Sequence, residues 1–227
     1  MERKKIDGLS FIKYAPRLLN TEKAIELSEA LKAQMTARRS VRTFSSAPIP
    51  KALIENLVEI ASSAPSGANK QPWTFCVVGN PELKKKIREA AEEEEYHNYH
   101  GRMNPEWIKE LRPMGTNWQK PFLESAPYLI VVFKKPYDID ERGHKTQNYY
   151  VNESVGIACG FLVAAIHQAG LVSLTHTPSP MNFLTELLDR PENERAYLIV
   201  PVAWPHSDCW VPDIHRKSLD QVVKFYE

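Results

Sequence analysis

The sequence predicts an α+β fold in which helices alternate with the strands of one sheet. Three apolar runs of strand composition are separated by segments with the periodicity of amphipathic helices, and these runs are 73–78, 128–133 and 197–203. The longest helical pattern, residues 149–169, contains small residues that permit another helix to approach closely. No repeat, low-complexity tract or long linker interrupts the pattern. We therefore expect a single domain over residues 1–227, with a C-terminal extension from about residue 205.

The first part of the chain predicts two helices and a strand. Thr21 is expected to cap a first helix, whose apolar side chains recur at helical spacing up to Met35. A second amphipathic helix covers residues 53–62, after a proline-containing loop. The run 73–78 predicts a core strand, which ends at a turn before a new helix.

Residues 82–122 are predicted to form a lid. A strongly charged helix containing four consecutive glutamates, Glu92 to Glu95, is interrupted by Gly101 and Pro105, and a second short helix starts near Trp107. Few of these residues are apolar, so we expect little of the segment to be buried. A segment held so loosely costs little to open, as substrate lids require.

The second half of the chain supplies the remaining elements. The run 128–133 is almost uninterrupted apolar sequence and predicts a central strand buried on both faces. The pattern at 149–169 predicts the central helix, which is stopped by Gly170. A short strand at 171–175, a short helix at 181–188 and a strand at 197–203 follow.

Composition narrows the class of partner. The chain has 29 Lys and Arg against 28 Asp and Glu, and this net charge of +1 gives no field that attracts nucleic acid or an anionic membrane. Cys76, Cys159 and Cys209 are too few and too scattered for a disulfide framework or a zinc site, which favours a reducing compartment. The most apolar run, 155–166, is shorter than the roughly 20 residues that span a bilayer. We expect a cytoplasmic protein, without a membrane anchor, that acts on a small molecule.

Two stretches carry the strongest chemical signal. Arg38, Arg39 and Arg42, with Ser40 among them, place three guanidinium groups within five residues, and such a group suits a phosphate. Taken alone, a run of this kind is most often a solvated surface. The second stretch, 65–73, begins Pro-Ser-Gly-Ala-Asn, which breaks a helix and predicts a turn whose exposed amides grip a flat, polar ring.

Together these stretches resemble the flavin-binding framework of the nitroreductase superfamily. The resemblance implies a mixed sheet flanked by helices, FMN as the cofactor, and an intertwined homodimer with FMN at the interface. The implied cofactor-binding residues are Arg38, Arg39, Ser40, Arg42, Pro65, Ser66, Thr175, His176, Thr177 and Arg216. Thr177 is implied to be catalytic, with its hydroxyl facing flavin N5, and Thr175 is the other candidate for that role.

A second resemblance, from about Thr36 to the end of the chain, is to the iodotyrosine deiodinases within that superfamily. Glu95 and Tyr99 are four residues apart, hence on one helix face, and Lys120 follows in Asn-Trp-Gln-Lys. The resemblance implies that these three bind the amino-acid zwitterion and that the Ala68 amide binds the substrate phenolate. Without it, Glu95 and Lys120 would be taken as solvated surface residues.

The resemblance implies FMN-dependent reductive dehalogenation of halogenated tyrosine, with NAD(P)H or another flavoprotein as the electron source. Two alternatives stay open, namely a general nitroreductase or quinone reductase and a flavin- or amino-acid-binding protein without turnover. The charged trio argues against the first. His97 and His100 lack a third fixed ligand, so we expect no metal site.

Overall fold

The computed structural model describes residues 2–227, which divide between Arg38 and Arg39 into two compact units. In the first unit, β1 (Arg3–Ile6) and β2 (Leu9–Ile12) pair antiparallel. Asp7 and Gly8 join them with φ of 49° and 81°, as a tight hairpin turn requires. This hairpin was not among the elements predicted from the sequence.

The other element of the first unit is α1 (Thr21–Ala37). Its cap is Asn20 rather than Thr21, because the Asn20 side chain accepts the Lys23 N–H at 2.9 Å and Thr21 is already helical. No residue of α1 is buried.

The second unit is built on a four-stranded sheet in the order β3-β4-β8-β7. Its strands are β3 (Trp73–Val78), β4 (Tyr128–Lys134), β7 (Val172–Ser173) and β8 (Arg195–Ala203). Neighbouring strands are antiparallel, and an isolated Ser40–Ser173 bridge adds parallel pairing, so the expected mixed sheet is confirmed. β4 is central as predicted, but β3 is an edge strand in this unit, with Val77 42% exposed.

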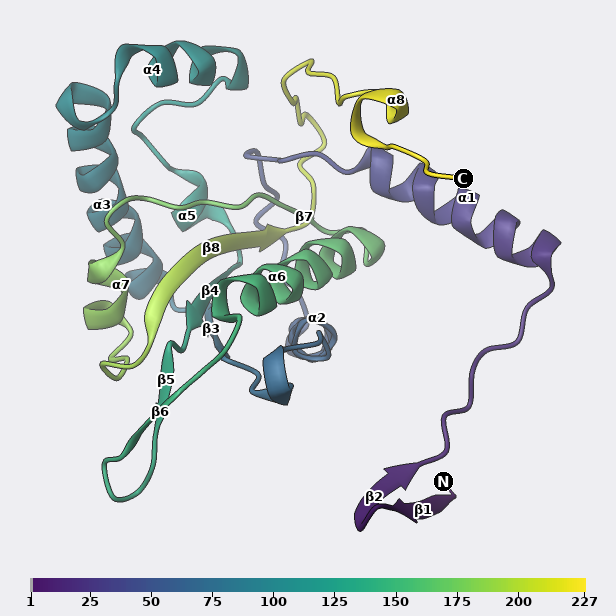
Figure 1. Cartoon of the computed structure of the whole chain (residues 1–227). Coiled ribbons are helices and arrows are strands. Elements are labelled where there is room, and N and C mark those ends of the chain that lie inside the picture. The colour runs from purple at the N-terminus through teal and green to yellow at the C-terminus, as the bar shows by residue number, and fades with distance from the viewer. Residues whose placement is uncertain (1) are drawn as a thin grey trace. The chain divides into compact units, whose positions relative to one another are not determined.

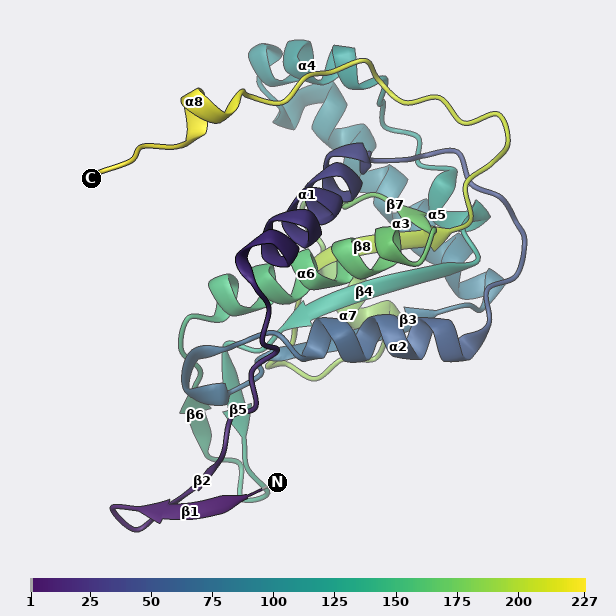
Figure 2. The ribbon, with the colours of Figure 1, turned by 90° about the vertical axis from the view of Figure 1, so that its right-hand side faces the viewer.

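Helices cover both faces of this sheet (Figures 1 and 2). On one face α2 (Lys51–Ser62) and α6 (Val151–Gln168) pack against Ile130 and Val132 of β4. On the other, α3 (Pro81–His97), α5 (Phe122–Ser125) and α7 (Asn182–Leu187) pack against Leu129 and Val131. Alternate side chains of β4 therefore enter two different cores, which is why its sequence is continuously apolar.

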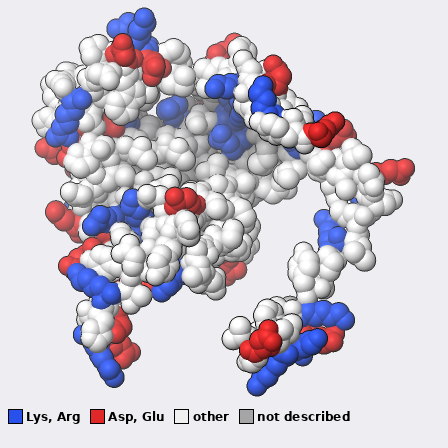
Figure 3. Space-filling model, viewed as in Figure 1, with Lys and Arg blue, Asp and Glu red and all other residues white. Residues whose placement is uncertain are grey.

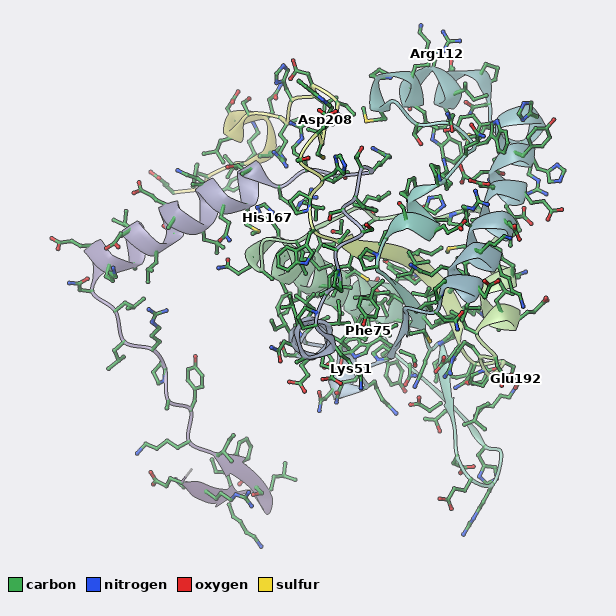
Figure 4. All side chains as sticks on the ribbon, turned by 180° about the vertical axis from the view of Figure 1, so that it is seen from behind. Lys51, Phe75, Arg112, His167, Glu192 and Asp208 are labelled. Atoms are coloured by element: carbon green, nitrogen blue, oxygen red, sulfur yellow. The ribbon has the colours of Figure 1, made fainter. Side chains whose placement is uncertain are left out.

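The remaining elements lie at the periphery of the second unit. They are the helices α4 (Pro105–Leu111) and α8 (Leu219–Val222), the helical turns η1 (Gly67–Asn69), η2 (Asn98–Arg102) and η3 (Arg112–Met114), and the hairpin strands β5 (Tyr137–Ile139) and β6 (Lys145–Gln147). The hairpin escaped prediction because strands of three residues are too short to show alternation. Glu192, labelled in Figure 4, anchors it through a 2.7 Å ion pair with Lys145.

The lid segment is only partly exposed. Ile87 and Ala91 of α3 are fully buried in the core shared with α5 and α7, so the expectation that little of residues 82–122 is buried was wrong for α3. It was correct for α4, which has no buried residue, and Arg112 just beyond it points outward (Figure 4). Two helices predicted as one mobile unit are thus held very differently.

Acidic and basic side chains are interspersed over the surface that Figure 3 shows. No helix within residues 2–227 combines the length and the apolar character needed to cross a bilayer.

Candidate functional site

The arginine segment of the second unit runs beside β7. The Val41 N–H donates to the Ser173 carbonyl at 3.1 Å, next to the Ser40–Ser173 bridge. The Arg39 guanidinium donates to the Pro212 carbonyl, and Arg42 is half-buried, so that desolvation lowers the pKa of its guanidinium. The segment therefore presents its polar side chains at the β7 edge of the sheet.

The two other predicted phosphate-binding arginines are Arg38, at the end of α1, and Arg216, in the C-terminal tail. Arg38 belongs to the first unit, where its N–H caps α1 on the Met35 carbonyl at 3.3 Å. Arg216 is exposed in the tail that precedes α8. Their roles toward a phosphate stay predictions.

The turn after α2 has an unusual backbone. Ala68, Asn69 and Gln71 have φ of 49°, 53° and 48°, the left-handed region that non-glycine residues seldom occupy. At Gly67 an added Cβ would lie 2.9 Å from the Tyr149 carbonyl oxygen, so a larger side chain does not fit. Strained turns of this kind are concentrated at ligand sites.

Most of the backbone amides of this turn donate hydrogen bonds within the second unit. The Gln71 N–H donates to Ser66 Oγ at 2.9 Å, and the Gly67 N–H reaches Ser154 Oγ at 3.4 Å. The amides of Asn69 and Lys70 bond to carbonyls within the turn. The Ala68 N–H is not a donor in any of these bonds, and its role toward a ligand stays a prediction.

Thr175, His176 and Thr177 form an extended segment beside β8. The His176 N–H and C=O both bond to Ile199, at 2.9 and 2.8 Å. His176 is buried, whereas Thr175 and Thr177 are exposed, as alternation along an extended chain requires. Both threonine hydroxyls thus lie on one face, and the geometry keeps both as candidates for the predicted catalytic role.

The His176 ring lies on the opposite face, edge-on to Phe122 at 5.7 Å between centroids. Burial, together with the nearby Lys120 and Arg42 cations, lowers the pKa of His176 to about 3, so the ring is neutral at physiological pH. Its Nε2 is buried and has no hydrogen-bond partner among residues 2–227.

Glu95, Tyr99 and Lys120 are brought together as the sequence predicted. Glu95 Oε2 lies 3.1 Å from Lys120 Nζ, and the two side chains are only 9% and 3% exposed. The ammonium also lies 5.5 Å from the centroid of the Tyr99 ring. An acid from α3, a phenol from η2 and a lysine from the segment before α5 therefore form one buried cluster.

Desolvation dominates the electrostatics of this cluster. Burial lowers the pKa of Lys120, although the carboxylate of Glu95 opposes the shift, and burial raises the pKa of Tyr99. The Arg42 cation acts on both groups, which places the arginine segment and the trio in one region of the second unit.

Other polar contacts of Lys120 were not predicted. Its Nζ donates to the Asn117 carbonyl and to Thr116 Oγ1, the latter at 3.3 Å, and its backbone N–H donates to Glu92 Oε1 at 2.6 Å. A signal for Glu92 was present, since it stands three residues before Glu95 and hence on a neighbouring part of the same helix face.

No group of three His, Cys, Asp or Glu side chains within residues 2–227 is arranged to hold a metal ion. The His100 ring instead bonds through Nδ1 to the Tyr96 carbonyl at 2.7 Å.

Comparisons with known proteins agree with this arrangement. The model of the nitroreductase family matches residues 35–204. The iodotyrosine deiodinase of Haliscomenobacter hydrossis is 58% identical over 96% of this chain and 98% of its own, and that of Hydra vulgaris is 46% identical over 95% and 80%. A crystal structure of oxidised iodotyrosine deiodinase bound to FMN and 3-iodo-L-tyrosine superposes with a TM-score of 0.74 at 31% identity, covering 87% of this chain and 99% of that one. The chain belongs to the nitroreductase family and, within it, to the iodotyrosine deiodinases.

Proposed function

We propose that this protein uses FMN to remove halogen reductively from halogenated tyrosine, giving tyrosine and halide. The buried Glu95–Lys120 pair beside Tyr99 carries the proposal, because a carboxylate and an ammonium in one desolvated cluster complement both charges of an amino acid. A related protein of known structure has FMN and 3-iodo-L-tyrosine bound together.

The residues present fit FMN. The half-buried Arg42 lies at the β7 edge with Arg39 and Ser40, a donor set suited to a phosphate and a polar ring edge, and Arg38 and Arg216 are proposed to add phosphate contacts. We assign Pro65, Ser66, Thr175 and His176 to the surroundings of the isoalloxazine. Bound FMN would supply the two electrons that replace the carbon–halogen bond by carbon–hydrogen, with uptake of one proton and release of halide.

The substrate is held at both ends. Glu95 accepts hydrogen bonds from its ammonium, Lys120 binds its carboxylate, and the Tyr99 hydroxyl lies between them. The Ala68 amide donates to the phenolate oxygen and stabilises its negative charge. We assign the catalytic role to Thr177, whose hydroxyl is directed to flavin N5.

We further propose a homodimer with FMN at the interface. The support is a stripe on α6 where Ile157 and Phe161 are 43% and 40% exposed and a Cβ added at Gly160 would meet no atom within 4 Å. Apolar side chains at this spacing on an exposed helix face favour burial against a second copy. Residues 1–227 would act as one FMN-binding domain, with the lid at about 82–122 and the extension from about 205.

The electron source is proposed to be NAD(P)H or a reductase. A cytoplasmic location is supported by the cysteines, because Cys76, Cys159 and Cys209 are all free thiols.

The test is iodide release. FMN-loaded protein reduced with dithionite is mixed anaerobically with 3-iodo-L-tyrosine, and iodide is measured with an ion-selective electrode beside reduction of a nitroaromatic compound. We expect stoichiometric iodide. Nitroaromatic reduction without iodide would identify a general nitroreductase, and binding without either reaction would identify a binding protein.

Two matched variants test whether the Thr177 or the Thr175 hydroxyl has the catalytic role. Thr177→Ala is expected to slow iodide release at least tenfold while sparing nitroaromatic reduction. A tenfold slower rate corresponds to a loss of about 1.4 kcal/mol of transition-state stabilisation. Thr175→Ala is expected to leave iodide release nearly unchanged. The reverse pattern would transfer the role to Thr175.

A further inference from the structure

One face of α3 is bonded along its length to the segment 120–126. The α3 residues involved are charged and three or four positions apart: Lys84, Arg88, Glu92 and Glu95. At one end, Lys84 Nζ donates to the carbonyls of Glu124 and Ala126, at 3.1 and 2.5 Å. At the other end, Glu95 pairs with the Lys120 ammonium at 3.1 Å. The segment that carries Lys120 is thus fixed from both ends.

Glu92 differs from the other three because it holds the backbone of Lys120. Its Oε1 accepts the Lys120 N–H at 2.6 Å, and its side chain is only 16% exposed. The Lys120 carbonyl accepts the Leu123 N–H at 3.0 Å. With both backbone polar groups bonded and Pro121 next in the chain, the backbone of Lys120 is fixed, and so is the direction in which its side chain leaves the chain.

We propose that Glu92 is a positioning residue: by accepting the Lys120 N–H, it aims the Lys120 ammonium at the carboxylate of the amino-acid substrate. This inference rests on the proposed function, which supplies that carboxylate. The Glu92 charge also favours the protonated form of Lys120, since it counters the desolvation that lowers the pKa of that group. In this proposal Glu92 acts only through Lys120, without a contact of its own to the substrate.

A purely structural role for Glu92 predicts a different effect on ligand binding. If Glu92 only joined α3 to α5, its loss would weaken the fold and affect all ligands alike. A positioning role instead predicts a loss confined to ligands that carry a carboxylate. Lys84 is the control for a tether, because it bonds to the same segment without contacting Lys120.

The experiment compares two ligands by isothermal titration calorimetry on FMN-loaded protein. One is 3-iodo-L-tyrosine, and the other is 2-iodophenol, which has the ring and the halogen but no amino-acid part. Glu92→Ala is expected to weaken 3-iodotyrosine binding at least tenfold, as loss of one charge-assisted hydrogen bond allows, and 2-iodophenol binding less than about twofold. Glu92→Gln, whose amide oxygen still accepts the N–H, is expected to stay within about threefold of wild type.

Two further variants complete the design. Glu93→Ala changes an exposed neighbour on the same helix and is expected to leave both affinities unchanged. Glu92→Asp shortens the side chain by one methylene and replaces the alanine variant if that does not fold, with the same selective loss expected. Lys84→Met is expected to lower the unfolding temperature without changing the ratio of the two affinities.

Equal losses for both ligands in the Glu92 variants, or an equally selective loss in Lys84→Met, would overturn the positioning role alone. Wild-type protein that does not bind 3-iodotyrosine would overturn the proposed function, and this inference with it.

Discussion

The helices α3 and α4 come from one charged stretch of sequence, yet they are held in different ways. α3 buries Ile87 and Ala91 completely, and the charges on its inner face are bonded to the segment 120–126. α4 buries nothing. Charge density along a helix therefore does not measure its exposure, because a charged helix can enter a core where each buried charge has a partner.

Removing the cation that pairs with a buried carboxylate of α3 should have the largest effect on the free energy of unfolding. Lys120→Met leaves the Glu95 carboxylate buried without its cation, which should lower the free energy of unfolding by about 3 to 5 kcal/mol. The matched change on α4, Lys109→Met, removes an exposed ammonium and should cost less than about 0.5 kcal/mol. Urea denaturation at a fixed FMN concentration measures both. Similar small values would mean that Glu95 turns to water once it is released.

The apolar contacts of the two helices give an intermediate effect. Ile87→Ala removes a fully buried side chain from the core and should destabilise the protein by about 2 to 5 kcal/mol. Ile108→Ala, on the exposed α4, should cost less than about 1 kcal/mol. If both variants unfold at the same urea concentration, the distinction between the helices is wrong.

The smallest expected effect is on the pH dependence of the free energy of unfolding. Burial lowers the pKa of Lys84 below its ordinary value of 10.5, so between that lowered pKa and 10.5 the unfolded chain binds more protons than the folded one. The free energy of unfolding should therefore gain a positive slope with pH in this window, of at most about 1.4 kcal/mol per pH unit. Denaturation curves in alkaline buffers should show this slope in wild-type protein and a smaller one in Lys84→Met. An unchanged slope would place the titration on another group.

Local pattern was sufficient for most of the fold. The strand 73–78 was predicted with its observed bounds, since continuous apolar sequence between turn residues has few other uses. The first hairpin was missed although Asp7-Gly8 is a strong turn signal, because its exposed strands show no apolar alternation. Apolar periodicity arises because one face of a strand or helix is buried, so a fully exposed strand does not show it.

The site was predictable as far as helix geometry and family resemblance extend. Glu95 and Tyr99 share a face by spacing, and the structure places Lys120 against both. Spacing places Glu92 on the same face as Glu95, but it does not predict the bond from Glu92 to the Lys120 backbone, since that contact joins residues 28 positions apart. The burial of Ile87 and Ala91 sets the inward face of α3, and burial of that kind follows from tertiary packing rather than from charge.

Because Glu95 and Lys120 form a buried ion pair, the effect of a ligand on this cluster depends on how many charges the ligand carries. A neutral phenol would leave the ion pair between Glu95 and Lys120 intact. A zwitterion would replace that ion pair by two, one between its ammonium and Glu95 and one between its carboxylate and Lys120. A ligand that bears only an ammonium or only a carboxylate takes one member and leaves the other buried alone, a state that costs several kcal/mol. Under the proposed function the site would therefore select by the number of charges that a ligand carries, and the phenol and the zwitterion, which have the same net charge, would bind with different changes in ion pairing.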